Sequence, residues 1–199
     1  MLSNPKIEEE KLDPRIKRTR KLIQRSFMDI IAEKGFQSIS VQDVTARAGV
    51  NRATFYAHFP DKYALLDYSM GEAFRREIEQ RMLNVCEFNL DNIRILIVTV
   101  CEFIKNIHSH NSADIQYQTL AETQIRSQVY ELILHWLEKI KTIKNCTVSR
   151  ERAATATSWA IYGLAHQWVH EKQKSSAKTF ADEVLPLIAA NLGQTIKFP

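Results

Sequence analysis

Glycine, proline and cysteine are scarce in this chain of 199 residues, which contains 5 Gly, 5 Pro and 3 Cys. Domains built from β-hairpins need many turns, and turns are rich in glycine and proline, so this scarcity favours helices. The cysteines are odd in number and scattered, and they form no CxxC pair: Cys86, Cys101 and Cys146. A disulfide framework and a cysteine-based zinc site are therefore not expected.

Long apolar runs are also missing. The most apolar stretch, residues 95–100, is far shorter than the roughly 20 residues that cross a bilayer. Residues 1–15 are polar and acidic and lack the apolar centre of a secretory signal peptide. We therefore expect a cytoplasmic protein with no role at a membrane. The P-loop, G-x-S-x-G and paired-histidine zinc motifs are absent from the sequence, so we expect neither an enzyme nor a cofactor.

Positive charge, by contrast, is concentrated in one part of the chain. Residues 15–62 contain ten Lys or Arg and four Asp or Glu, whereas residues 63–199 contain fifteen of each kind. A basic block beside a neutral body is typical of a module that binds a polyanion such as nucleic acid. The same excess of charge also fits an ordinary solvated face, so charge alone leaves both interpretations open.

The basic block begins with a predicted helix. Asp13-Pro14 is a helix start, with an N-cap followed by proline at the first helical position, and Gly35 is placed to end the helix. Its buried face is predicted at positions i, i+4, i+7 and i+8, which are occupied by Ile23, Phe27, Ile30 and Ile31.

Two short helices separated by a tight turn are predicted at residues 40–48 and 51–59. Ser40 and Asn51 are good N-caps, and Gly49 can take the left-handed conformation that such a turn needs. This spacing is typical of a helix-turn-helix. The outward face of the second helix has no acidic residue but has an arginine, a threonine, a tyrosine and a histidine, which can donate hydrogen bonds to phosphates or bases. The alternative is a helical hairpin inside a bundle, with the tyrosine and the histidine half-buried.

The rest of the chain predicts a separate helical body. Residues 93–107 are apolar on nearly every side, as in a helix buried all round, although residues 95–100 alone would also fit a strand. Pro186 is expected to kink or split the last helix. Helical apolar stripes recur in three later segments, at residues 129–140, 150–172 and 180–192.

Residues 37–66 read QSISVQDVTARAGVNRATFYAHFPDKYALL. This segment resembles the signature of the tetracycline-repressor-type (TetR) regulators, with alanine-glycine-valine at the turn, then threonine-phenylalanine-tyrosine, then His-Phe-x-x-Lys. The resemblance covers about residues 15–68, and beyond residue 75 only the architecture matches. It implies an all-α chain of about nine helices. The implied parts are a flexible segment 1–13, a three-helix DNA-binding domain 14–68, and a helical-bundle domain 69–199 for dimerisation and effector binding.

The resemblance also implies which residues contact DNA. Base contacts are implied for Gln42, Arg52, Ala53 and Ala57. Phosphate contacts are implied for Thr54, Tyr56, His58 and Lys62. Because two of the four base-contacting residues are alanines, we expect base readout to fall mainly on Arg52 and Gln42. Asn51 stands where the family commonly has serine, a change that keeps the helix cap.

One recognition helix reads only a few base pairs, so we expect a homodimer that binds a palindromic operator in double-stranded DNA. The resemblance places the dimer interface on the last two helices, at Ala153, Ala156, Ala160, Gly163, Phe180, Val184 and Ile188. The alternative is that these residues pack within one subunit. The expected function is a transcriptional repressor that an unknown small-molecule effector releases from DNA. A TetR-like co-regulator acting through a protein partner is the alternative.

The sequence gives little information about the effector site. The candidates are aromatic and polar residues of the predicted bundle, each of which alone is more often core or surface: His108, Tyr117, Glu122, Trp136, Trp159, Tyr162 and His166. His108 and His110 stand two positions apart at an expected helix end, and the sequence shows no third partner for them. A metal site is therefore not expected.

Overall fold

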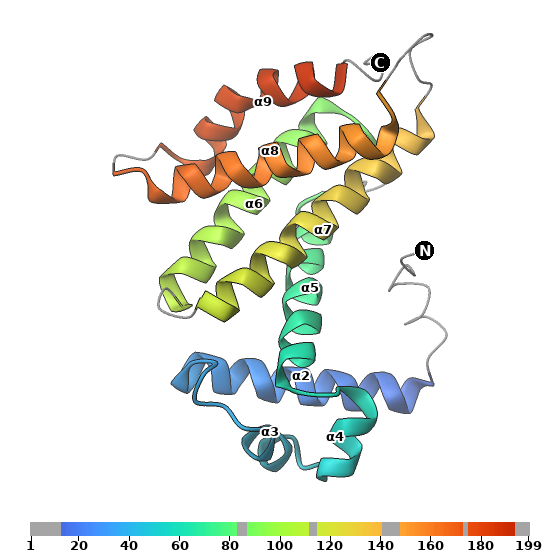
Figure 1. The fold of residues 1–199 in the computed structure, drawn as a ribbon, viewed down its shortest axis with the longest axis vertical. Helices are drawn as coiled ribbons and strands as arrows, with labels where there is room; N and C mark the ends of the chain where they lie inside the picture. The colour runs from blue at the N-terminus through green and yellow to red at the C-terminus, as the bar shows by residue number, and fades with distance from the viewer. Residues whose placement is uncertain (1–12, 83–86, 112–114, 141–147, 173–174, 194–199) are drawn as a thin grey trace. The chain divides into compact units, whose positions relative to one another are not determined.

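The computed structural model describes residues 13–82, 87–111, 115–140, 148–172 and 175–193, whose regular structure is entirely α-helical (Figure 1). Residues 1–12 of the segment expected to be flexible lie outside these ranges, as do Cys86 and Cys146. The described residues form eight helices, close to the expected number: α2 (Pro14–Lys34), α3 (Val41–Ala48), α4 (Arg52–His58), α5 (Lys62–Arg81), α6 (Leu90–Asn111), α7 (Ile115–Lys139), α8 (Arg150–His170) and α9 (Ala177–Gly193).

The chain divides into two compact units, and the boundary falls between Ser69 and Met70, inside α5. The N-terminal unit contains α2, α3, α4 and the first two turns of α5. The C-terminal unit contains the rest of α5 and the helices α6 to α9. Among the described residues, no helix is both long and apolar enough to cross a membrane.

The core of the N-terminal unit forms on the face of α2 that the sequence predicts. Asp13 caps this helix by accepting a hydrogen bond from the Arg15 backbone N at 2.7 Å. Burial of each large apolar side chain stabilises the folded state by about 1.5–3 kcal/mol. The side chains of this core are at most 6% exposed: Ile23, Phe27, Ile30, Ile31, Phe36, Ile39, Val44, Ala48, Phe55, Phe59, Leu65 and Leu66.

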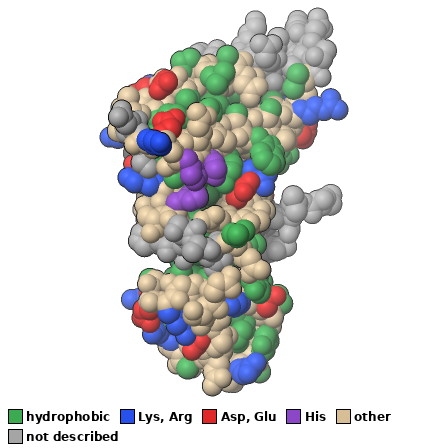
Figure 2. All heavy atoms as spheres, turned by 60° about the vertical axis from the view of Figure 1, so that its left-hand side comes forward, with side chains coloured by type: hydrophobic (Ala, Val, Ile, Leu, Met, Phe, Trp, Pro, Cys, Tyr) green, Lys and Arg blue, Asp and Glu red, His purple; other side chains and the backbone are tan. Residues whose placement is uncertain are grey.

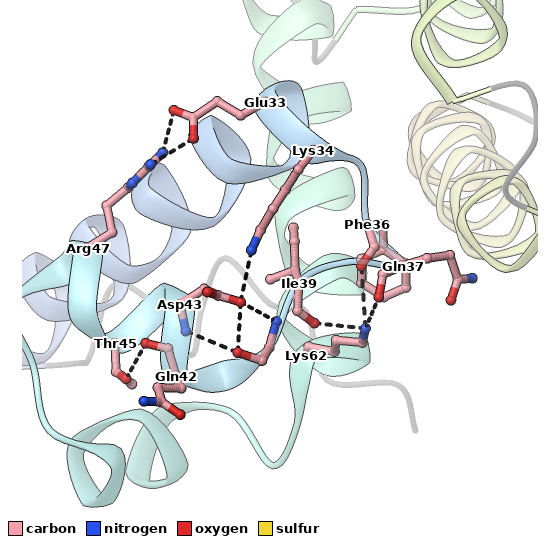
Figure 3. Close-up of polar contacts among 11 residues, drawn as sticks. Glu33, Lys34, Phe36, Gln37, Ile39, Gln42, Asp43, Thr45, Arg47 and Lys62 are labelled. Atoms are coloured by element: carbon pink, nitrogen blue, oxygen red, sulfur yellow. Dashed lines mark hydrogen bonds and ion pairs between the residues drawn. The ribbon is translucent and has the colours of Figure 1, made fainter.

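Lys62, the first residue of α5, binds the loop between α2 and α3 (Figure 3). Its Nζ donates hydrogen bonds to the carbonyl oxygens of Phe36 at 3.3 Å, Gln37 at 3.3 Å and Ile39 at 2.9 Å. The ammonium also lies 4.7 Å from the centroid of the Phe36 ring. An ammonium group has three N–H donors, so these carbonyls engage all of them. Lys62 therefore holds the segment that leads into α3.

The C-terminal unit is a bundle in which α7 packs on α6 and α8, and α9 packs on α6 and α8. α6 is buried on most sides and is a helix throughout, which removes the strand alternative for residues 95–100. α9 continues unbroken through Pro186, so the proline does not split it. α6 continues to Asn111, so His108 lies in the last turn of the helix, at the helix end that the sequence predicts.

Replacing Lys62 with methionine keeps the aliphatic stem and removes the ammonium. We expect Lys62→Met to lower the free energy of unfolding by about 1–3 kcal/mol, because three carbonyls lose a charged donor. Urea denaturation followed by circular dichroism measures the change. Lys21→Met, at an exposed position of α2, is the matched control and should unfold like the wild type. Equal stability of the two variants would contradict this role for Lys62.

Candidate functional site

The helix α3 begins with a capping box (Figure 3). The Asp43 carboxylate accepts hydrogen bonds from the Ser40 backbone N at 2.8 Å and the Ser40 hydroxyl at 2.7 Å, and Ser40 Oγ accepts from Asp43 N at 3.2 Å. Lys34 Nζ lies 3.1 Å from the same carboxylate. The hydrogen bonds from Ser40, with a smaller contribution from Lys34, lower the pKa of Asp43 to about 2. The carboxylate therefore stays ionised, and the cap intact, throughout the neutral pH range.

The turn after α3 is made by Gly49, whose φ of 64° and ψ of 32° lie in the left-handed region, as predicted. A side chain at this position would strain the backbone. Near the same end of α3, Arg47 forms a two-point ion pair with Glu33 of α2, with N–O distances of 2.6 and 2.7 Å (Figure 3). This ion pair joins α3 to α2 at the surface, above the buried contacts of Val44 and Ala48.

The second helix of the motif, α4, is held by its cap and by two phenylalanines. Asn51 Oδ1 accepts a hydrogen bond from Thr54 N at 2.7 Å, so asparagine caps the helix as expected. Phe55 is fully buried, and Phe59, directly after the helix, is 2% exposed. The remaining face of α4 points away from this core and contains no acidic residue.

The residues assigned to DNA contacts lie at or near the surface of the N-terminal unit. Gln42, Arg52, Ala53, Tyr56 and Ala57 are exposed, and Thr54, His58 and Lys62 are half-buried. Arg52 Nη2 donates a hydrogen bond to the Tyr56 hydroxyl at 3.3 Å, and its guanidinium lies 5.9 Å from the Tyr56 ring centroid. These two side chains thus stand together, one turn apart, on the exposed face of α4. The contacts of all eight residues with DNA stay predictions.

The basic helix α2 places one arginine beside α4. The Arg20 guanidinium lies 5.3 Å from the Phe59 ring centroid and 5.0 Å from that of Tyr68. Burial and the Arg20 charge lower the pKa of His58 below its ordinary value. At neutral pH His58 is therefore uncharged, and the positive charge next to it belongs to Arg20.

A pocket of about 110 Å³ lies between α6, α7 and α8 of the C-terminal unit. Four of the seven predicted effector residues line it: His108, Glu122, Tyr162 and His166. The rest of its lining is mainly apolar and consists of Ile104, Ile107, Ile115, Gln118, Thr119, Ala121 and Ile125. The pocket lining is therefore mixed, with polar and apolar side chains in nearly equal number.

The other three predicted effector residues are not part of this lining. Tyr117 is 5% exposed and Trp136 is fully buried, with its ring 6.0 Å from that of Phe88. Trp159 is 53% exposed, and the Arg126 guanidinium stacks 3.9 Å from its ring centroid. These residues were predicted as effector contacts because they are aromatic. An aromatic side chain does not by itself indicate which side of its helix faces a pocket.

Glu122 is the centre of the polar contacts in the pocket. Burial and the neighbouring Glu122 carboxylate raise the pKa of Tyr162 to about 12, so the phenol stays protonated and its O–H donates a hydrogen bond to Glu122. Arg126 Nε lies 3.4 Å from the same carboxylate. Burial, with His170 and His166 nearby, lowers the pKa of His108, which favours its neutral imidazole. The pocket therefore offers a carboxylate acceptor beside neutral aromatic groups.

The residues assigned to a dimer interface divide into two groups. Four are buried within the single chain: Ala153, Phe180, Val184 and Ile188, at 8% exposure or less. These four side chains pack within the single chain, and their assignment to a dimer interface stays a prediction. The other three lie on the outer face of α8, where Ala156 and Gly163 are exposed and Ala160 is half-buried. On α9, Leu187 is 61% exposed.

Three histidines meet in the C-terminal unit, a grouping that the sequence did not indicate. His108 of α6 lies beside His166 and His170 of α8, and one ring nitrogen from each lies within 4.8 Å of the others. Figure 2 shows histidine side chains gathered at the molecular surface. The i, i+4 spacing of His166 and His170 on a predicted helix was a signal for the pair. Their partner comes from another helix 58 positions earlier in the chain, and only the fold brings it close.

Comparison with known proteins locates a family match in the N-terminal unit. Residues 28–68 match the family described as bacterial regulatory proteins, tetR family. YxbF, an uncharacterised HTH-type transcriptional regulator of Bacillus subtilis, is 40% identical over 60 residues, which are 30% of this chain but only 16% of YxbF. YvdT, a second such regulator of Bacillus subtilis, is 23% identical over 182 residues, 86% of this chain and 93% of YvdT.

Solved structures match over both units. The TetR-family regulator SCO0857 of Streptomyces coelicolor has a TM-score of 0.60 at 17% identity, covering 91% of this chain and 98% of that protein. RolR, solved in complex with resorcinol, has a TM-score of 0.51 at 16% identity, covering 93% and 97%. Residues 28–68 of the N-terminal unit therefore resemble the helix-turn-helix of tetR-family regulators, and the all-α fold of both units is that of SCO0857.

Proposed function

We propose that this regulator is a homodimeric repressor that binds a palindromic operator through α4 and leaves it when a small molecule enters the pocket of the C-terminal unit. The observation that carries the DNA-binding part is the exposed, acid-free face of α4, which a cap and two buried phenylalanines hold in place. Such a regulator acts in the cytoplasm, where bacterial DNA lies.

Arg52 is the residue we propose as the main base reader. It is exposed on the first turn of α4, and its hydrogen bond to Tyr56 leaves most of its five N–H donors for other partners. Arginine pairs with the O6 and N7 acceptors of guanine through two such donors. Thr54, Tyr56 and His58 would then contact the phosphates on either side of the base. Lys62 would have to release a carbonyl to join them.

The outer face of α8 supports the dimer. Ala156, Ala160 and Gly163 follow one another at i, i+4 and i+7, and small side chains at this spacing let a second helix approach closely. A Cβ added at Gly163 meets no atom within 4 Å, so packing inside the chain gives no reason for a glycine there. Leu187 of α9 adds an exposed apolar side chain. We therefore propose an interface through the exposed faces of α8 and α9, without the buried Phe180, Val184 and Ile188.

The effector we propose is a small phenol-like molecule. The pocket volume of about 110 Å³ suits a single ring, its isoleucines suit an apolar body, and Glu122 suits a hydroxyl donor. RolR, which shares the fold, was solved with resorcinol, a small phenol. Effector binding here would act on α6 and α8, the helices that form the pocket together with α7.

Replacing Arg52 with alanine should relax specificity. We expect the ratio of affinities for operator and scrambled DNA to fall by a factor of about 10 to 100, since one arginine–guanine pair is worth about 1–3 kcal/mol of discrimination. Fluorescence anisotropy on DNA from the gene's own promoter measures both affinities. Thr54→Val, which removes a phosphate donor, should weaken both equally. An unchanged ratio for Arg52→Ala would refute the assignment.

Absence of binding by the wild type at low salt would favour the co-regulator that acts through a protein partner.

Gly163→Arg tests the dimer. Within one chain the arginine meets no neighbour and improves helix propensity, so the fold should be kept. In the dimer, the bulky charge would lie between two helices, and we expect a monomer by light scattering and loss of operator binding. Ser127→Arg, at an exposed position of α7, is the control and should remain a dimer. A dimeric Gly163→Arg variant would place the interface elsewhere.

Thr119→Trp tests the pocket. Thr119 lines the pocket from an exposed position, so a tryptophan there should fill the cavity without disturbing the core. We expect isothermal titration to show resorcinol binding to the wild type and none to this variant. Thr123→Trp is the matched control, because Thr123 is also exposed and makes the same bond to the carbonyl one turn back. Equal binding by all three proteins would show that the pocket is not the site, and no binding by any would exclude small phenols.

A further inference from the structure

The three histidines of the C-terminal unit form a compact group at the ends of two helices. The ring centroids of His166 and His170 are 4.4 Å apart, and His108 lies 4.9 Å from His170 and 5.9 Å from His166. One nitrogen from each ring lies within 4.8 Å of the other two. Three nitrogens bound to one tetrahedral zinc ion at about 2.0–2.1 Å lie about 3.3 Å apart. Small side-chain rotations therefore bring the three rings to bonding distance.

The side chain of His170 is already oriented as a metal ligand. Its Nδ1 lies 2.8 Å from the carbonyl oxygen of His166. A carbonyl only accepts hydrogen bonds, so Nδ1 carries the proton and Nε2 keeps its lone pair. Metal-binding histidines commonly have this arrangement, with one nitrogen donating to a carbonyl and the other free for the ion.

The backbone around the group favours a cation. His170 is the last residue of α8, and His108 lies within the last turn of α6. The carboxyl ends of helices carry partial negative charge, which stabilises a positive charge placed within the last turn. Two helix ends therefore direct this charge towards the same place. His166 and His170 are exposed, so an ion from solution reaches them directly.

We propose that His108, His166 and His170 form a binding site for one divalent transition-metal ion of the zinc type. Three neutral imidazoles suit Zn²⁺ and its neighbours Co²⁺, Ni²⁺ and Cu²⁺, whereas Mg²⁺ and Ca²⁺ prefer oxygen ligands. The ion would join α6 to α8 and keep an open coordination position, as three-histidine zinc sites do. His108 and His166 also line the pocket, so the ion would lie at its edge. The site does not depend on the proposed repressor function.

Metal binding is measured on the full chain, prepared without a histidine tag and stripped of metal with a chelator. We expect isothermal titration with Zn²⁺ alone to give one ion per chain, and Co²⁺ to give the absorption bands of a four-coordinate ion. The double variant His166→Gln/His170→Gln should lose both signals. His108→Asn should weaken Zn²⁺ binding by at least about tenfold, because it removes one of three ligands. Mg²⁺ should not bind to the site at all.

His135→Gln is the matched control, since His135 is an exposed histidine of α7 outside the group. It should bind Zn²⁺ like the wild type. The doubly substituted positions are exposed, so the fold should survive, and circular dichroism checks that it does. A wild-type chain that does not bind Zn²⁺ would overturn the proposal. So would a double variant that binds it unchanged, because the ion would then be held by other residues. The repressor function would stand in either case.

Discussion

The helix-turn-helix of the N-terminal unit depends on the packing of Phe55 in its core. α4 has only seven residues, and an isolated helix of that length does not persist in water, because nucleation costs more than its few hydrogen bonds return. The fully buried Phe55 supplies the missing stabilisation, and Asn51 satisfies a donor at the first turn. One side of α4 is thus fixed to the core. The opposite side is left with side chains that contribute little to stability, which leaves them available for recognition.

The features predicted from the sequence were those whose cause lies within a few residues. The N-caps at Asp13 and Ser40 and the left-handed Gly49 each depend on the backbone of one turn, and the structure confirms all three. The apolar stripe of α2 was predictable for the same reason, since helical periodicity tells which side faces a core. These local signals position the helix-turn-helix and were enough to identify it.

Features that depend on a partner far along the chain were not predictable in this way. An apolar stripe shows that a face is buried but not by which molecule, so Phe180, Val184 and Ile188 fitted a dimer as well as a monomer core. The family resemblance implied a phosphate contact for Lys62, which stays a prediction, but it gave no sign that the ammonium binds carbonyls 23 to 26 positions away. The histidine group needs α6 and α8 side by side, and no periodicity within either helix indicates that pairing.

The ion pairs around α3 have a consequence for how the regulator responds to salt. DNA binding draws its salt dependence from counterions that are released when protein cations replace them along the phosphates. The sequence counts ten cations in residues 15–62, but Arg47 faces Glu33, Lys34 faces Asp43 and Lys62 faces carbonyls. These three side chains already have partners inside the N-terminal unit. Fewer than ten cations are therefore available to replace counterions without first breaking a contact, and we expect affinity to depend less on ionic strength than the count of ten suggests.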